Sequence, residues 1–352
     1  MKIVTIVGAR PQFVKAAVVS REFRRMPAVR EVIVHTGQHY DPVLSDTFFR
    51  ELDLPAPGHH LGIGSGGHGE QTGAMLATIE RVLLAERPDW VLVYGDTNST
   101  LAGALAAAKL GMPLAHVEAG LRSYNQAMPE EINRVLTDHV SRLLLAPTPT
   151  AVANLAREGI TGDKVRLVGD VMVDSALTFA GRADADALLG RLGVEVGRYL
   201  LATIHRAENT DDPARLAAIV DGLIAAGGHS RVVVPLHPRT RNALRRHGLE
   251  ERAGAGLILI EPLGFLDMLA AERHALAVVT DSGGVQKEAA LFGVPCLIMR
   301  RETEWTELIA NGAARLVNPP DLAAALATLQ RVAVPVPDLG AAGRVAAALT
   351  EG

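Results

Sequence analysis

Three carboxylates stand where strands of the expected sheet end, and such groups could take a proton from a carbon atom and return one to it. They are Asp96, Glu118 and Glu130, in the stretches Tyr-Gly-Asp-Thr (94–97), His-Val-Glu-Ala-Gly-Leu-Arg (116–122) and Pro-Glu-Glu-Ile-Asn-Arg (129–134). Structural explanations exist too: Asp96 or Thr97 could be a helix N-cap, and Glu130 an acid in a first helical turn. As a group of three at neighbouring strand ends, the acids favour acid–base catalysis.

The clearest phosphate-binding pattern is Thr-Asp-Ser-Gly-Gly-Val-Gln-Lys-Glu over residues 280–288. A strand leads into Ser282, Gly283 and Gly284, whose backbone N–H groups could wrap a diphosphate at the start of a helix. Glu288, about one turn further along, could accept hydrogen bonds from ribose hydroxyls. The pattern therefore favours a nucleotide site over a plain helix-start turn.

A second glycine turn follows the first expected strand and reads Gly-Ala-Arg-Pro over residues 8–11. Its backbone N–H groups could face an anion, with Arg10 and Lys15 adding positive charge. A turn with two solvated cations explains the same residues equally well. Because the turn lacks the Gly-x-Gly-x-x-Gly spacing, the sequence does not support a dinucleotide site.

Histidines and one phenylalanine follow other strands. His35 and His39 are four residues apart, but they straddle a strand end and a glycine turn, so we expect no metal site there. His205 stands next to Arg206, which favours contact with an anion over the role of an ordinary loop histidine. Phe265 could stack on a nucleotide base or belong to the core.

The elements that must position these side chains alternate along the chain. Short apolar runs are followed by longer Ala- and Leu-rich amphipathic stretches, which is the pattern of βαβ units and parallel sheets. A charged, turn-rich stretch at residues 181–198 separates two such sets. We therefore predict an α/β protein with two Rossmann-like domains, residues 1–180 and residues 181–338, that bind ligands beyond the carboxyl ends of their strands. The expected strands are residues 3–7, 32–36, 90–94, 114–117, 143–146 and 165–168, and then 199–203, 232–235, 257–260, 277–280 and 296–299.

The composition limits the class of protein. The 352 residues carry a net charge of −4 and only 4% aromatic residues, which argues against a nucleic-acid partner. No apolar stretch approaches the roughly 20 residues that span a bilayer, so no membrane partner is expected. The first strand follows Met1 and Lys2 without the pattern of a signal peptide, so we expect a cytoplasmic protein. A single cysteine, Cys296, excludes an internal disulfide framework.

Six strings occur together in an order and spacing that resembles the non-hydrolysing UDP-N-acetylglucosamine 2-epimerase family, from residue 1 to about residue 317. They are residues 8–11, 94–97, 116–122, 129–134, 205–209 and 281–288. The resemblance implies a glycosyltransferase-B-like fold with the active site in the interdomain cleft, and a homodimer. It also implies a final helix, at about residues 339–352, that can pack back on the first domain. Neither a metal nor another cofactor is implied.

The family's chemistry implies that UDP is eliminated across C1 and C2 of a UDP-2-acetamido sugar, which leaves a bound 2-acetamidoglucal. UDP is added again after C2 is reprotonated on the other face. By this resemblance the partner of the chain is its UDP-sugar substrate, and the catalytic residues are Asp96, Glu118, Glu130 and His205. The residues implied for UDP are Arg10, Lys15, Ser282, Gly283, Gly284 and Glu288, with Phe265 as a candidate for the base.

Further positions bear on the substrate sugar or on regulation: Gln38, His39, Arg134, Arg206, His237, Thr303, Glu304 and Trp305. Three of them, Gln38, Arg206 and His237, match a site at which UDP-N-acetylglucosamine activates members of the family. The residues that follow Gln38, at 40–41, and Glu70 depart from that site, so the sequence does not predict this regulation for the present chain.

Residues 303–305 depart from the family in a way that concerns the sugar, because Thr-Glu-Trp replaces the usual Thr-Glu-Arg. With residues 35–39, this looks like the branch that acts on UDP-2,3-diacetamido-2,3-dideoxy-glucuronate, giving the manno epimer, in lipopolysaccharide assembly. UDP-N-acetylglucosamine is the alternative substrate. A UDP-sugar glycosyltransferase and a UDP-sugar-binding protein without chemistry are the more distant alternatives.

Overall fold

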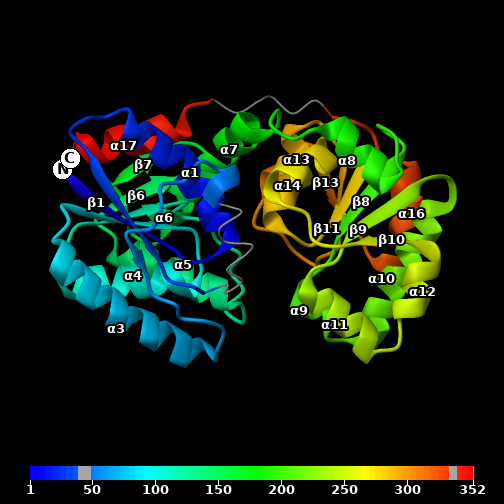
Figure 1. Cartoon of the computed structure of the whole chain (residues 1–352), viewed down its shortest axis with the longest axis horizontal. Coiled ribbons are helices and arrows are strands. Elements are labelled where there is room, and N and C mark those ends of the chain that lie inside the picture. The colour runs from blue at the N-terminus through cyan, green and yellow to red at the C-terminus, as the bar shows by residue number, and fades with distance from the viewer. Residues whose placement is uncertain (39–48, 333–338, 352) are drawn as a thin grey trace. The chain divides into compact units, whose positions relative to one another are not determined.

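The computed structural model describes residues 1–38, 49–332 and 339–351 (Figure 1). The chain divides into two compact units, one of residues 1–178 with 337–352 and the other of residues 179–336. His39, one of the candidate residues, lies outside the described part. None of the helices in the described ranges is long and apolar enough to cross a membrane.

The first unit is built on a seven-stranded parallel sheet with the order β3-β2-β1-β4-β5-β6-β7. Figure 1 shows α3 and α4 on one side of this sheet and α1 and α17 on the other. The strands are β1 (Lys2–Val7), β2 (Arg30–His35), β3 (His59–His60), β4 (Trp90–Tyr94), β5 (Leu114–Val117), β6 (Leu143–Ala146) and β7 (Val165–Leu167). The helices are α1 (Arg10–Arg24), α3 (His68–Glu86), α4 (Asn98–Lys109), α5 (Pro129–Val140), α6 (Pro149–Arg157), α7 (Val171–Phe179) and α17 (Ala341–Thr350).

The second unit contains a six-stranded parallel sheet with the order β10-β9-β8-β11-β12-β13. Its strands are β8 (Tyr199–Thr203), β9 (Arg231–Pro235), β10 (Ile258–Ile260), β11 (Ala277–Thr280), β12 (Cys296–Ile298) and β13 (Ala314–Leu316). Its helices are α8 (Ala185–Leu192), α9 (Ala207–Thr210), α10 (Pro213–Ala226), α11 (Pro238–Arg246), α12 (Glu250–Gly256), α13 (Phe265–Arg273), α14 (Gly283–Leu291), α15 (Thr306–Ala310) and α16 (Leu322–Ala327), with 3-10 turns η1 (Gly227–His229) and η2 (Pro319–Asp321).

Both sheets reverse their strand order beside their first strand. In the first unit β1 lies between β2 and β4, and in the second β8 lies between β9 and β11. Ligands of doubly wound sheets bind beyond the carboxyl ends of the strands at this reversal. The candidate stretches follow these very strands: residues 8–11 follow β1, residues 94–97 follow β4, residues 205–209 follow β8 and residues 281–288 follow β11.

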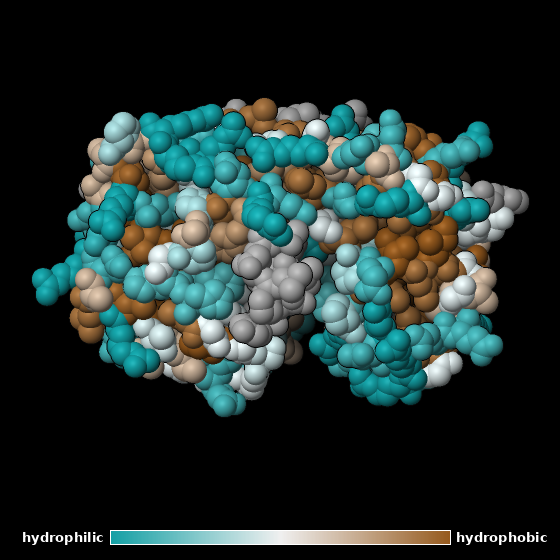
Figure 2. Space-filling model, viewed as in Figure 1, coloured by the Kyte–Doolittle hydropathy of each residue, from teal (hydrophilic) through white to brown (hydrophobic). Residues whose placement is uncertain are grey.

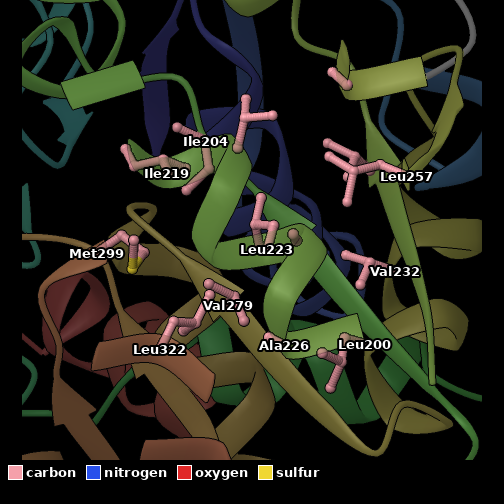
Figure 3. Close-up of a cluster of buried hydrophobic side chains, with 14 of the residues drawn as sticks. Leu200, Ile204, Ile219, Leu223, Ala226, Val232, Leu257, Val279, Met299 and Leu322 are labelled. Atoms are coloured by element: carbon pink, nitrogen blue, oxygen red, sulfur yellow. The ribbon is translucent and has the colours of Figure 1, made fainter. Parts of the chain in front are cut away.

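The core of the second unit follows the alternation of side chains along its strands. On β8, Leu200 and Ala202 belong to one buried cluster, which includes Leu223 of α10 (Figure 3). Tyr199 and Leu201 belong to the cluster on the other face of the sheet. Both faces are therefore covered, which explains why the strands read as continuous apolar runs.

Two short edge strands were not among the expected ones. β3 is only His59–His60, and β13 is Ala-Arg-Leu at Ala314–Leu316. Neither stretch has the apolar run by which a strand is recognised, and each pairs along one edge only. Pairing with β2 and β12, and not local propensity, makes them strands.

The last helix, α17, is part of the first unit and packs against α1. Asp174 holds its start, because the carboxylate accepts the backbone N–H groups of Gly340 at 3.1 Å and Ala342 at 2.8 Å. Arg344 donates to the carbonyl of Val168 at 2.7 Å, and the apolar side of the helix is buried. A carboxylate at a helix N-terminus is the arrangement that the helix dipole favours.

Candidate functional site

The Glu118 carboxylate lies at the carboxyl end of β5 in an ion pair with the ammonium of Lys15, and both side chains are 9% exposed. Gly95 makes room for them, because a Cβ atom there would lie 3.2 Å from Lys15 Nζ and 3.3 Å from Glu118 Oε2. Glu118 itself has φ +75°, a conformation that costs energy for a side chain with a Cβ and is concentrated at functional sites. The ion pair, the glycine and the backbone conformation of Glu118 together fix the position of its carboxylate.

Asp96 follows β4 and forms an ion pair with Arg134 of α5. The N-cap of α4 is Thr97, whose side chain accepts from Thr100, so the Asp96 carboxylate is not used as the cap. Asn133 donates to the Asp96 carbonyl at 2.9 Å, and Arg134 is held on its other side by Glu131 at 2.9 Å. Both neighbouring strand ends thus present a carboxylate beside a cation.

Glu130 is exposed in the first turn of α5, where Pro129 starts the helix. It stands four residues before Arg134, so the two share one face of the helix. The structure thus brings Asp96 and Arg134 together and places Glu130 one turn away from Arg134 on α5. Arg10, at the first position of α1, is half-buried.

The glycine turn after β1 differs from its expected role. Gln12 accepts the backbone N–H groups of Gly8 at 2.8 Å and Ala9 at 3.1 Å, so these donors already have a partner within the protein. Gly8 is required for packing, since a Cβ atom there would lie 2.0 Å from Thr36 Oγ1. Of the two explanations for this turn, the contacts of Gln12 give no support to an anion held by these two N–H groups.

Gln38 packs onto the start of α4, where its amide oxygen accepts the backbone N–H of Ser99 at 2.9 Å and the Ser99 hydroxyl at 2.6 Å. A further chain of amides leads from there to the candidate acid. Asn98 donates to Gln71 at 2.9 Å and accepts from Asn133, which contacts the Asp96 carbonyl. Gln38 thus lies beside the network that holds Asp96.

In the second unit a buried carboxylate, Asp281, ties two candidate turns together. It accepts the backbone N–H groups of His205 and Arg206, each at 2.9 Å, and the side-chain amide of Asn209 at 2.9 Å. Arg206 in turn donates to the Asp281 carbonyl at 3.1 Å. Sequence reasoning assigned no role to Asp281, although it stands in the phosphate-binding pattern.

His237 is the N-cap of α11, and its ring lies 5.3 Å from that of His205. Arg206 is the N-cap of the neighbouring α9. Figure 2 shows hydrophilic side chains gathered over α9 and α11 on this face of the second unit. His205, Arg206 and His237 are therefore brought together, as a polar group that could meet an anion.

Gly283 and Gly284 begin α14, so their N–H groups belong to the first helical turn, which has no carbonyl partner within the helix. The Ser282 N–H is bonded to the Thr280 hydroxyl at 2.9 Å, which removes one of the three donors expected for a diphosphate. Glu288, expected at the ribose, is buried one turn further along the helix.

Residues 300–305 cover this helix start. Glu304 accepts from Arg300 at 2.9 Å, and a Cβ atom at Gly283 would lie 2.6 Å from Glu304 Oε1 and 3.3 Å from Trp305 Nε1. Thr303 bonds Gln286 at 2.7 Å. Thr303, Glu304 and Trp305 are thus placed directly beside the phosphate-binding turn.

Two aromatic side chains of the second unit, Trp305 and Phe265, differ in their surroundings. Lys287 Nζ lies 3.9 Å from the centre of the Trp305 ring, a cation–π contact. Phe265 is 4% exposed and packs edge-on against Phe179, with 6.1 Å between ring centres. Of the two roles considered for Phe265, this structure shows the core contact.

A family model described as UDP-N-acetylglucosamine 2-epimerase matches residues 21–338. Over 320 residues the chain is 53% identical to the UDP-2,3-diacetamido-2,3-dideoxy-D-glucuronate 2-epimerase of Pseudomonas aeruginosa, covering 90% of this chain and 88% of the relative. It is 44% identical to a UDP-N-acetylglucosamine 2-epimerase of Methanococcus maripaludis, covering 88% and 85%.

Solved structures of UDP-GlcNAc 2-epimerases also match this chain. The UDP-GlcNAc 2-epimerase of Methanocaldococcus jannaschii, in complex with UDP-GlcNAc and UDP, matches with a TM-score of 0.93 and 41% identity over 100% of both chains. The UDP-GlcNAc 2-epimerase of Neisseria meningitidis bound to UDP-GlcNAc matches with a TM-score of 0.89 and 27% identity over 100% of both chains. The expected α/β fold class, two Rossmann-like domains of the glycosyltransferase-B-like kind, is confirmed.

Proposed function

This chain belongs to the UDP-N-acetylglucosamine 2-epimerase family, and from that membership we propose that it inverts C2 of a UDP-2-acetamido sugar by eliminating UDP and adding it back. As a UDP-sugar 2-epimerase the protein is an isomerase. The observation that carries the proposed mechanism is the pair of carboxylates Asp96 and Glu118, each beside a cation at the ends of the neighbouring strands β4 and β5.

In the first proposed step a carboxylate takes the C2 proton, the electron pair of the C2–H bond forms the C1=C2 bond, and the C1–O bond to UDP breaks. The 2-acetamidoglucal and UDP remain bound. In the second step a carboxylic acid protonates the opposite face of C2 while the diphosphate oxygen of UDP bonds to C1 again. Two acid–base groups on opposite faces of the sugar are needed, and we assign them among Asp96, Glu118 and Glu130.

The departing diphosphate gains negative charge, which fixed donors and cations stabilise without having to reorganise. We assign this role to the N–H groups of Gly283 and Gly284 at the start of α14, together with His205 and Arg10. We propose that Glu288 binds the ribose. The acids belong to the first unit and the glycine turn to the second. By family resemblance we also propose a homodimer that works in the cytoplasm.

The substrate that we favour is UDP-2,3-diacetamido-2,3-dideoxy-glucuronate. It is supported by the 53% identity to the Pseudomonas aeruginosa enzyme named for that substrate. It is also supported by Trp305, which lies beside the phosphate-binding turn at a position where we expect an arginine in epimerases for UDP-N-acetylglucosamine. UDP-N-acetylglucosamine remains the second candidate, since two relatives named for it are 44% and 45% identical, and one named as a homolog of such an enzyme is 52% identical.

The test is incubation with each UDP-sugar in deuterated water without an acceptor. We expect deuterium at C2 and a mixture of C2 epimers, because the proton that returns comes from solvent. The Glu118→Gln variant serves as the control, since it keeps the shape of the side chain without its acid–base chemistry. An unchanged sugar, or free sugar with UDP, contradicts the epimerase mechanism and favours a binding protein or a transferase.

A further inference from the structure

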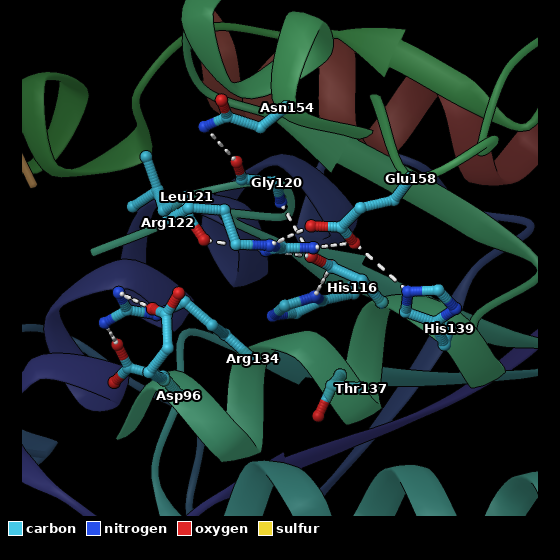
Figure 4. Close-up of polar contacts among 12 residues, drawn as sticks. Asp96, His116, Gly120, Leu121, Arg122, Arg134, Thr137, His139, Asn154 and Glu158 are labelled. Carbon is cyan, nitrogen blue, oxygen red and sulfur yellow. Dashed lines mark hydrogen bonds and ion pairs between the residues drawn. The ribbon is translucent and has the colours of Figure 1, made fainter. Parts of the chain in front are cut away.

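A group of charged side chains that includes His116 and Arg122 lies next to Gly120 (Figure 4). The side chains of His116 on β5 and Asp138 on α5 are both 0% exposed. His116 Nδ1 lies 2.7 Å from Asp138 Oδ1, and His116 Nε2 lies 2.7 Å from the carbonyl oxygen of Gly95. Both ring nitrogens of His116 therefore face an oxygen.

The two partners of His116 determine its protonation. A carboxylate and a carbonyl oxygen only accept hydrogen bonds, so each ring nitrogen must carry a proton, and a histidine with two N–H groups is an imidazolium. Arg122 donates to Asp138 and to Glu158, each at 2.7 Å. Two cations, His116 and Arg122, then stand against the buried Asp138 and the partly exposed Glu158, so their charges balance.

The same contacts reach both candidate acids. Gly95, whose carbonyl His116 contacts, directly precedes Asp96. Asp138 also accepts the backbone N–H of Gly120 at 3.0 Å, two residues after Glu118. A single carboxylate therefore fixes the turn after β5 directly and the turn after β4 through His116.

Helix α5 adds a third connection. Asp138 follows Arg134 by four residues, so the two lie on one face of α5. Arg134 binds the Asp96 carboxylate. A shift of α5 would therefore disturb Asp96 at its side chain and at the preceding carbonyl together.

We propose that Asp138 keeps His116 as an imidazolium, and that this pair positions Asp96 and Glu118 without touching the substrate. The protonation state stands on the geometry alone, whereas the positioning role rests on the proposed epimerase function. Neither residue belongs to the acids or to the phosphate-binding turn, so each can be changed without removing a reacting group.

The first test is ¹⁵N NMR of histidine-labelled, full-length enzyme at neutral pH. We expect both ring nitrogens of His116 to carry protons, and this state to be lost in Asp138→Asn, because the amide takes away the negative charge that the imidazolium faces. A wild-type spectrum with one protonated ring nitrogen overturns the imidazolium.

The second test is kinetic. For Asp138→Asn we expect kcat for C2 epimerisation to fall by about 10- to 100-fold, the range in which misplacement of reacting groups by about 1 Å acts, with KM and the Kd for UDP little changed. His139→Gln is the matched control, since His139 neighbours Asp138 on α5 but contacts only the outer Glu158 among these groups. We expect it to keep the wild-type kcat. A wild-type kcat in Asp138→Asn, or an equal loss in His139→Gln, overturns the positioning role.

His116→Gln covers the case in which Asp138→Asn fails to fold, as judged by loss of UDP binding. Its amide can still donate to the Gly95 carbonyl but carries no charge, so we expect a smaller loss of kcat than in His116→Ala, with UDP binding retained. Equal losses in the two variants contradict positioning through Gly95.

If wild-type enzyme epimerises neither UDP-sugar, the proposed function fails, while the NMR result still decides the protonation of His116.

Discussion

Lys15 and Glu118 form their ion pair directly over Gly95, so the first helix of the unit, the end of β4 and the end of β5 meet at one point. The Lys15 ammonium holds the Glu118 carboxylate at this position. Lys15 was expected at the diphosphate, whereas here it contacts one of the candidate acids. A Lys15 variant can therefore distinguish a role in binding the diphosphate from a role in holding Glu118.

The Lys15→Met variant should therefore lose catalysis more than UDP affinity. We expect kcat to fall by about 100-fold, equivalent to about 2.7 kcal/mol, because Glu118 loses its partner in a buried place. The Kd for UDP, measured by calorimetry, should change little. Lys109→Met, at an exposed helix end, is the control and should alter neither quantity. If the variant binds UDP weakly but epimerises normally, Lys15 acts in binding the diphosphate and not through Glu118.

Gly95→Ala should impair activity through the same contact. Gly95 has φ +63° and Gly111 has φ +68°, so an alanine strains the backbone equally at both positions. We expect a loss of about 1–2 kcal/mol in the free energy of unfolding for each, measured with urea. Nothing lies within 4 Å of a Cβ atom at Gly111, whereas at Gly95 it would press on Lys15 and Glu118. Only Gly95→Ala should lose kcat, and equal kcat values in the two variants would contradict this.

Trp305→Phe tests the substrate assignment. The change removes the indole Nε1, which lies beside Gly283, and keeps a ring beneath Lys287. We expect the ratio of kcat/KM between the diacetamido-glucuronate substrate and UDP-N-acetylglucosamine to change by about tenfold, or about 1.4 kcal/mol. Trp90→Phe, in the core of the other unit, should leave the ratio unchanged. If the ratio is the same in Trp305→Phe and in the wild type, Trp305 does not contribute to the choice of sugar.

Acid stability should depend on Asp138. Burial alone would raise the pKa of its carboxyl, but the hydrogen bonds and charges of His116 and Arg122 outweigh burial and hold the pKa below the ordinary 3.8. A lowered pKa means that the group stabilises the fold above its unfolded pKa, and that this contribution is lost as the pH falls through the folded pKa.

We therefore expect the free energy of unfolding to decline between about pH 5 and about pH 2, and Asp138→Asn to decline less. At neutral pH the variant should be less stable by about 3 kcal/mol, since the buried Arg122 loses one of its two carboxylate partners and His116 loses the charge that it faces. Urea unfolding at several pH values measures both. Parallel curves for the two proteins would show that Asp138 does not carry the acid sensitivity.

Sequence patterns predicted both sheets, and the positions of Asp96 and Glu118 after strands, because these depend on local features. Apolar runs mark β4 and β5, and Asp96 and Glu118 follow these runs closely, whereas Glu130 lies in the first turn of α5. Contacts over long chain distances could not be found in this way. Asp138 reaches back 22 residues to His116, and Asn133 reaches back 37 residues to the Asp96 carbonyl; neither contact leaves a periodic pattern.

The position of α17 has a consequence for synthesis of the chain. Its buried side, which includes Val345 and Leu349, packs within the unit that contains β1, so that unit is begun first on the ribosome and completed last. The second unit can fold while the first still lacks its final helix. Until α17 has been synthesised, the apolar surface of the first unit that this helix covers stays exposed. We expect the chain to be most prone to aggregation, and most dependent on a chaperone, during that time.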